Sequence, residues 1–212
     1  MLKPRDGCPR GFKEGNMIQY VKGTQVSPQF NFAARNGDDY FDIKFCTNEK
    51  KSPGSSNAEW ESGQYCILSY DGFCPEGFFD GFIKYGKDKV KVVAWPLPDG
   101  KFNDEIVWHF CCREDGSWKD PLYLPTKEPF SLFPRDSECQ QVKDMKAEKQ
   151  WFMIQSSGDI FVTGSSPNVR IAKKTSVFVD ICYYWPIDYN CGGIINISND
   201  NPVVEIKSPN YP

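Results

Sequence analysis

Short apolar runs separated by turn-forming residues are the main pattern of hydrophobic and polar positions along this chain. The runs are rich in Phe, Ile, Val, Trp and Tyr, which favour a pleated, half-buried strand. Gly, Pro, Ser and Asn interrupt them at short intervals, as is typical of turns. The pattern predicts a mainly β, antiparallel domain with its clearest strands at Tyr40–Cys46, Glu105–Cys112, Trp151–Gln155, Asp159–Thr163 and Val177–Trp185.

One segment has a pattern that favours a helix. Ser137 is followed three residues later by Gln140, which is the spacing of a capping box. Cys139, Val142 and Met145 then follow at intervals of three residues, close to the period of one helix face. We therefore expect at most one short helix, over about residues 137–149.

The chain also repeats itself. The segment Cys8–Gly15 recurs as Cys74–Gly81, and an Ile-x-Tyr triplet follows each copy, ending at Tyr20 and at Tyr85. From each tyrosine, 26 residues lead to a cysteine that ends a predicted strand. Matches in this order predict two related sub-units of similar length, over about residues 8–65 and 74–139.

Nine cysteines are scattered from Cys8 to Cys191, a distribution that favours disulfides formed in an oxidising compartment. Equivalent positions of a repeat should pair in the same way, so we predict the bridges Cys8–Cys46 and Cys74–Cys111. The remaining four cysteines of the repeat region allow three pairings, and the sequence does not separate them: Cys66, Cys112, Cys139 and Cys182.

Composition argues against several functional classes. A net charge of −3 has the wrong sign for a protein that binds nucleic acid through its phosphates. No apolar run approaches the roughly 18 residues of a membrane-spanning helix, so we expect no membrane span. The chain has no Cys-x-x-Cys pair and a single histidine, so we expect no metal site and no cofactor.

The start of the sequence lacks the apolar run of a signal peptide. Because the cysteines indicate an oxidising compartment, we interpret the sequence as a piece of a longer secreted protein. Asn196 begins an Asn-Ile-Ser triplet, which is a glycosylation acceptor pattern and agrees with secretion.

Two tryptophans are the candidate ligand-binding residues. Trp60 and Trp118 lie in polar, Gly- and Ser-containing segments beside carboxylates. A large apolar ring in such a loop either forms a binding surface or folds back onto the core. Flat aromatic faces beside carboxylates suit sugar rings, which present C–H faces and hydroxyl edges.

An enzyme is the least favoured interpretation. Any serine or cysteine nucleophile would have to use His109, the only histidine, and no catalytic motif supplies it with a partner. In the repeat, His109 aligns with Lys44, so we interpret it as a solvent-facing strand position. We expect no catalytic residue.

A series of motifs points to a known family. In chain order these are Gln64–Ile67, Cys74–Phe78, Leu97–Gly100, Phe110–Arg113, Leu124-Pro125, Pro129–Leu132, Cys139–Val142 and Cys182–Tyr184. The series resembles the apextrin C-terminal (ApeC) domain family over about residues 8–185. The family pattern carries eight cysteines, which match the eight from Cys8 to Cys182.

This resemblance implies a secreted or cell-surface protein without enzymatic activity. Family members are linked to binding of bacterial peptidoglycan in innate defence, and also to development and extracellular matrix. The expected function is therefore recognition of microbial glycan or peptidoglycan. The alternative is a matrix or adhesion module that binds other extracellular proteins.

The tail carries a second resemblance. Cys191-Gly192-Gly193, followed by the segment Ile206–Pro212, resembles the opening of a CUB domain. We therefore expect residues 191–212 to begin a CUB-like domain that the sequence does not complete. On this interpretation, the ninth cysteine, Cys191, has its partner beyond Pro212.

Overall fold

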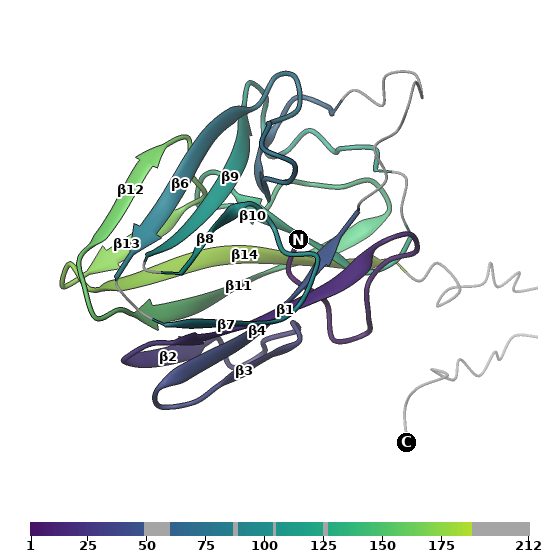
Figure 1. Ribbon diagram of the computed structural model, residues 1–212. Coiled ribbons are helices and arrows are strands. Elements are labelled where there is room, and N and C mark those ends of the chain that lie inside the picture. Colours follow the sequence, from purple (N-terminus) through teal and green to yellow (C-terminus); the bar gives the residue numbers. More distant parts are fainter. Residues whose placement is uncertain (49–59, 87–88, 104, 125–126, 188–212) are drawn as a thin grey trace, which may run out of the picture.

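The computed structural model describes residues 1–48, 60–86, 89–103, 105–124 and 127–187 (Figure 1). Within these residues the chain forms strands and no helix. The strands are β1 (Lys13–Tyr20), β2 (Gly23–Val26), β3 (Ala34–Asn36), β4 (Tyr40–Thr47), β5 (Gln64–Leu68), β6 (Phe79–Tyr85), β7 (Val90–Ala94), β8 (Gly100–Phe102), β9 (Ile106–Glu114), β10 (Phe130–Pro134), β11 (Met145–Gln155), β12 (Ile160–Gly164), β13 (Val169–Ala172) and β14 (Ser176–Pro186). All five strands expected from the sequence are present.

The strands form two antiparallel sheets. The smaller sheet has the order β3-β4-β1-β7, and it lies in the lower part of Figure 1. The larger sheet has the order β12-β6-β9-β5-β10-β14-β11-β2, with β13 paired to β14 and β8 paired to β9. The mainly β, antiparallel fold predicted from the sequence is thus confirmed.

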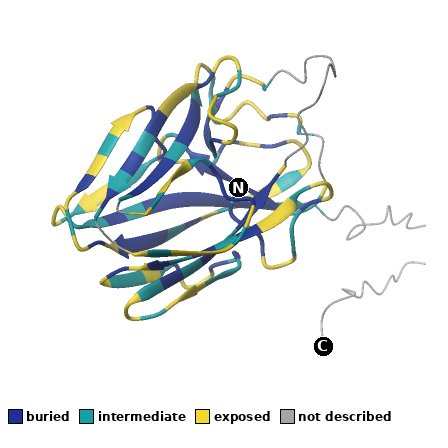
Figure 2. Cartoon of the chain, viewed as in Figure 1, coloured by how far each residue is buried: buried dark blue, intermediate teal, exposed yellow. Residues whose placement is uncertain are grey.

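Alternation of apolar residues sets the inner face of each sheet. In β9, Trp108 and Phe110 are buried in the main core, whereas His109 between them is half-buried on the other face. The large sheet curls so far that Trp108 meets Phe152 of β11, with ring centroids 5.9 Å apart. Phe45 of β4 closes this core from the smaller sheet, 5.7 Å from Trp108. Figure 2 shows the buried stretches of β9, β11 and β14 in dark blue.

A second, smaller core lies on the opposite face of the large sheet. Tyr184 of β14 and Phe130 of β10 stack there with ring centroids 4.7 Å apart. Tyr183, next to Tyr184, and Phe133, three residues after Phe130, belong to the main core, because residues an odd number of positions apart on a strand point to opposite faces. Loops between β9 and β11 cover this second core, contributing Leu122 and Val142.

Four disulfides connect these elements. Cys8–Cys46 and Cys74–Cys111 are bonded, which confirms the pairing predicted from the repeat. The structure also resolves the open pairings as Cys66–Cys112 and Cys139–Cys182. The first of these joins directly opposed residues of β5 and β9.

The internal repeat is also confirmed as local structure. Gly15 opposes Phe45 in the β1–β4 pair, and Gly81 opposes Phe110 in the β6–β9 pair. Before each pair, a Pro-x-Gly-Phe turn places its glycine at a positive φ, 85° at Gly11 and 80° at Gly77. In both turns the Phe N–H donates to the Pro carbonyl at 3.1 Å. The two sub-units therefore share one design but contribute their paired strands to different sheets.

The prediction of a helix over residues 137–149 is wrong. That segment forms a loop followed by the first part of β11. Cys139 is bonded to Cys182, and the side chain of Gln140 turns inward to the backbone of other segments instead of capping a helix. Tertiary bonding thus outweighs the local pattern.

Several expectations concern residues outside the described part of the chain. The glycosylation candidate Asn196, the cysteine Cys191 and the CUB-like segment 191–212 all lie there. In the described part, no helix has the length and apolarity that crossing a membrane requires.

Candidate functional site

An open cavity of about 900 Å³ lies against the β6–β9 pair of the second sub-unit. Its lining combines aromatic rings, carboxylates and the only histidine. The lining residues that give the cavity its chemical character are Phe73, Phe79, Asp80, Asp99, His109 and Ser165. A concave surface of this size, with apolar rings and a few polar groups, is the usual form of a small-ligand site.

Two phenylalanines give the cavity exposed apolar surface. Phe73 is 84% exposed and Phe79 is 57% exposed, although both rings are large and apolar. Phe73 follows a tight turn in which Asp71 and Gly72 both have positive φ, as a type I′ turn requires. A short turn of this kind fixes the backbone position of Phe73 beside the cavity.

Asp99 fixes that turn from the side. One carboxylate oxygen accepts hydrogen bonds from the Ser69 hydroxyl at 2.7 Å and the Gly72 N–H at 2.8 Å. The other accepts from the Asp71 N–H at 3.1 Å. Since these three donors occupy both of its carboxylate oxygens, Asp99 has a structural role in shaping the cavity wall.

Asp80 and His109 lie on the strands themselves. In the β6–β9 register, Asp80 opposes Cys111 and Phe82 opposes His109, so the two polar side chains are diagonal neighbours. The His109 ring lies 5.9 Å from the Phe82 ring, and His109 is half-buried on the face of β9 opposite to Trp108 and Phe110. In the described chain, no hydrogen bond reaches the His109 ring.

Trp60 lies behind one wall of the cavity. Its ring contacts Tyr65 and Phe78 of the second core, at centroid distances of 6.3 and 5.6 Å, and Phe78 in turn lines the cavity. The Trp60 side chain is half-buried. Of the two alternatives for a tryptophan in a polar loop, the structure places Trp60 folded back onto a core.

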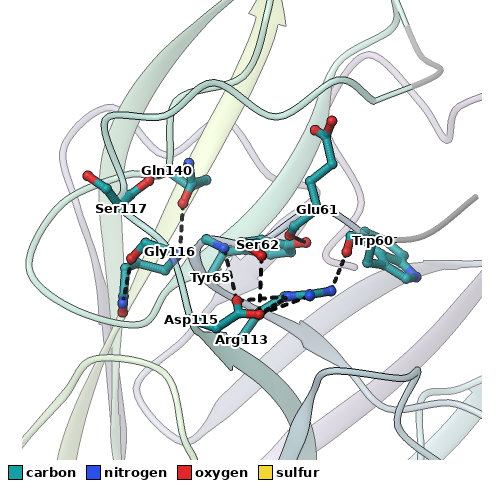
Figure 3. Close-up of polar contacts among 11 residues, drawn as sticks. Trp60, Glu61, Ser62, Tyr65, Arg113, Asp115, Gly116, Ser117 and Gln140 are labelled. Carbon is teal, nitrogen blue, oxygen red and sulfur yellow. Dashed lines mark hydrogen bonds and ion pairs between the residues drawn. The ribbon is translucent and has the colours of Figure 1, made fainter.

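A polar network anchors the Trp60 segment (Figure 3). Arg113 Nη1 donates to the Trp60 carbonyl, and Arg113 Nε and Nη2 donate to the Asp115 carboxylate at 2.9 Å each. The Arg113 hydrogen bonds hold the pKa of the Asp115 carboxyl below its usual range. Asp115 also accepts from Ser62 Oγ at 3.2 Å and from the Gly63 N–H at 3.3 Å.

The Tyr65 phenol completes this anchoring. Its hydroxyl donates to the Glu61 carbonyl at 2.8 Å, next to Trp60 (Figure 3). Burial raises the pKa of Tyr65, so the phenol stays neutral and keeps its proton for this bond. Trp60 is therefore positioned by bonds to its own carbonyl and to that of the next residue.

Trp118 lies on a different loop, which Gln140 holds. Gln140 Oε1 accepts from the Gln64 N–H at 2.7 Å, and Nε2 donates to the Asp120 carbonyl at 2.6 Å. The Trp118 ring is half-buried, with the Lys119 ammonium 5.4 Å from its centroid. Among the cavity-lining residues neither Trp118 nor Trp60 occurs.

Phe73, Phe79 and Asp80 were not among the binding residues expected from the sequence. The signal for Phe73 was present, because the Asp71-Gly72 pair just before it is a tight-turn signal. Nothing in a single sequence indicated that Phe79 stays exposed. The exposure of Phe79 depends on how the first residues of β6 lie relative to the core, which is a property of the folded sheet.

The described residues of the site offer groups that can bind a ligand. No cluster of three or more His, Cys, Asp or Glu side chains in the described residues could hold a metal ion. Apolar rings, a carboxylate and hydroxyls instead suit a ligand with apolar faces and polar edges.

Comparison with known proteins identifies the family of the chain. Residues 1–184 match the family model described as the C-terminal domain of apextrin, ApeC. The chain belongs to the ApeC family. No curated protein and no solved structure matches it.

The ApeC match and the four disulfides bear on three expectations. The family is not known for enzymatic activity. Four disulfides in one domain are consistent with an extracellular protein. The match ends at residue 184, and no comparison supports the CUB-like domain expected over residues 191–212.

Proposed function

We propose that this ApeC domain is a non-enzymatic recognition module of a secreted protein, and that it binds microbial cell-wall glycan, peptidoglycan in particular, in innate defence. The cavity with its two exposed phenylalanines is the observation that supports the proposal. Leaving such rings in water is unfavourable, and exposed apolar surface set among polar groups is typical of a binding site. A sugar chain would cover the rings and satisfy the polar rim.

Retention on insoluble peptidoglycan tests this proposal. With the oxidised full chain, we expect the double variant Phe73→Ala/Phe79→Ala to lose retention about tenfold, as for the removal of aromatic contacts at the centre of an interface. Both rings are mainly exposed, so the variant should fold. Trp95→Ala is the matched control, because Trp95 is 71% exposed and does not line the cavity. No retention of the oxidised wild-type chain would refute the proposal.

Trp60 and Trp118 remain proposed ligand-binding residues. Trp60 supports the proposal through Phe78, whose ring it contacts and which lines the cavity. We expect Trp60→Ala and Trp118→Ala to weaken retention without unfolding the domain. Circular dichroism of each variant checks the fold, and a retention equal to that of the wild type would remove that residue from the site.

An adhesion module that binds another protein is the second candidate function. β7 ends the smaller sheet and carries exposed apolar residues, with Val93 50% exposed and Trp95, just after the strand, 71% exposed. An edge strand of this kind can pair with a strand of a partner. This candidate predicts that Val93→Lys abolishes capture of a host matrix protein, whereas added sugars do not compete.

A further inference from the structure

The internal repeat reveals what is unusual about the cavity. In the first sub-unit, Glu14 of β1 is neutralised by two ammonium groups, those of Lys3 and Lys44. The Lys44 Nζ lies 2.7 Å from Glu14 Oε1. Together, the hydrogen bonds from Lys3 and Lys44 hold the pKa of Glu14 below its usual value.

The second sub-unit has an acid at the same place. Glu14 opposes Cys46 in the first strand pair, and Asp80 opposes Cys111 in the second. Because Cys46 and Cys111 are the equivalent half-cystines of the repeat, Asp80 is the structural counterpart of Glu14. The repeat thus keeps a carboxylate at this strand position.

Neither ammonium group is retained. His109 takes the place of Lys44, two residues before the equivalent cysteine. Ser69 takes the place of Lys3, since the Lys3 N–H donates to the Lys44 carbonyl at 2.9 Å and the Ser69 N–H donates to the His109 carbonyl at 3.0 Å. Within the described residues, no ion pair or hydrogen bond reaches the Asp80 carboxylate.

The lining of the cavity shows the same shortage of positive charge. Among the described residues, it includes Asp80, Asp99 and Glu114 but no lysine or arginine. Asp99 is satisfied by the turn that it anchors, and Glu114 is paired with Arg135 at 2.8 Å. Asp80 is exposed, and among the described carboxylates of the lining it is the one left available to pair with the positive charge of a ligand.

We propose that this cavity binds an amino sugar chain with free amines, such as a de-N-acetylated glucosamine oligomer, with one ammonium group placed at Asp80 where the first sub-unit places its lysines. The inference rests on the proposed function, since it names the chemical class of glycan for the same site. The sugar rings cover Phe73 and Phe79, and aromatic faces also attract ammonium groups.

The size and walls of the cavity favour a chain of sugars over a single ammonium side chain. The cavity volume of about 900 Å³ is at the upper end of the range for small-ligand sites. One lysine side chain would fill only part of this volume. Ser165, also in the lining, is 8% exposed, and its hydroxyl has no hydrogen-bond partner in the described chain.

Calorimetric titration of the oxidised full chain with a β-1,4-linked glucosamine tetramer tests the inference. We expect binding that is at least about tenfold tighter than that of the N-acetylglucosamine tetramer, because acetylation removes the charge-assisted bond to Asp80. Asp80→Asn should remove this preference. Equal binding of the two tetramers, or a preference that survives Asp80→Asn, would overturn the inference.

The first sub-unit provides the matched variants. His109→Lys recreates the pair of Lys44 and Glu14, so it should fold and should block the ligand ammonium with a loss of at least about tenfold in affinity. The reciprocal change, Lys44→His, lies in the first sub-unit and should leave binding unchanged. Unaltered binding by His109→Lys would contradict the assigned position.

Two further probes separate this inference from other outcomes. If trilysine binds as tightly as the glucosamine tetramer, the site recognises ammonium groups alone and the amino sugar assignment is wrong. If peptidoglycan is retained but the tetramers do not differ, this inference fails while the proposed function stands. If the glucosamine tetramer binds at Asp80 and peptidoglycan is not retained, the inference stands and the peptidoglycan assignment falls.

Discussion

Gln140 shows how much a single buried side chain can hold in this domain. It is fully buried, its Oε1 accepts from the Gln64 N–H at 2.7 Å, and its Nε2 donates to the Asp120 carbonyl at 2.6 Å. Its own carbonyl accepts from the Tyr184 hydroxyl at 2.7 Å. One residue therefore joins β5, the Trp118 loop and β14.

We expect Gln140→Ala to lower the free energy of unfolding by about 2–4 kcal/mol, because the change leaves buried backbone groups without partners. Urea denaturation at neutral pH measures the loss. Gln141→Ala is the control, since Gln141 is exposed and should change stability by less than about 0.5 kcal/mol. Similar losses for both variants would mean that the side-chain hydrogen bonds of Gln140 do not add to the free energy of unfolding.

The same residue explains a wrong prediction. Ser137 and Gln140 have the spacing of a capping box, and a capping box depends on neighbours along the chain. Gln140 instead bonds to Gln64 and Asp120, which lie 76 and 20 residues away. A local pattern contains no information about such partners, so the sequence could not reveal this role.

At the scale of strands, the repeat carried more information than any single segment. Shared spacing predicted the two related sub-units and their bridges, since equivalent strands impose equivalent cysteine geometry. It could not predict the cavity. The carboxylate of Asp80, which lines the cavity, lacks the ammonium partners of Glu14 because the two copies differ at Ser69 and His109, and this difference acquires meaning only when the three-dimensional surroundings are known.

One glycine of each copy tests whether the strand pairs are equivalent in packing. A Cβ on Gly81 would lie 2.1 Å from the Ser165 carbonyl oxygen, and a Cβ on Gly15 would lie 1.8 Å from the Pro96 carbonyl oxygen. In both cases the neighbour is backbone, which cannot turn aside as a flexible side chain can. Each strand pair thus needs a glycine where another segment crosses it.

We expect Gly15→Ala and Gly81→Ala each to lower the free energy of unfolding by about 1–3 kcal/mol, the usual cost of overpacking. Thermal or urea unfolding measures both. Gly23→Ala serves as the control, because the nearest atom to its Cβ would be Gln155 Oε1 at 3.4 Å, an ordinary contact. If only one of the two variants were destabilised, the packing equivalence of the repeat would be refuted.

The whole molecule depends on four cross-links that close chain segments of similar length. The sequence separations of the bridges are 38, 46, 37 and 43 residues. In the chain-entropy account, each bridge therefore stabilises the fold by a similar amount, about 4 kcal/mol. Differences between the bridges must then arise from their surroundings in the folded state.

Those surroundings differ most between Cys66–Cys112 and Cys8–Cys46. Cys66 and Cys112 are both fully buried in the main core, whereas Cys8 is only half-buried. Replacing Cys66 and Cys112 by alanine removes the cross-link and also leaves a cavity, which adds about 1–2 kcal/mol to the loss. We therefore expect the Cys66→Ala/Cys112→Ala variant to be less stable in urea than Cys8→Ala/Cys46→Ala, by that amount. Equal losses, or the reverse order, would show that packing around the buried bridge does not contribute beyond the cross-link itself.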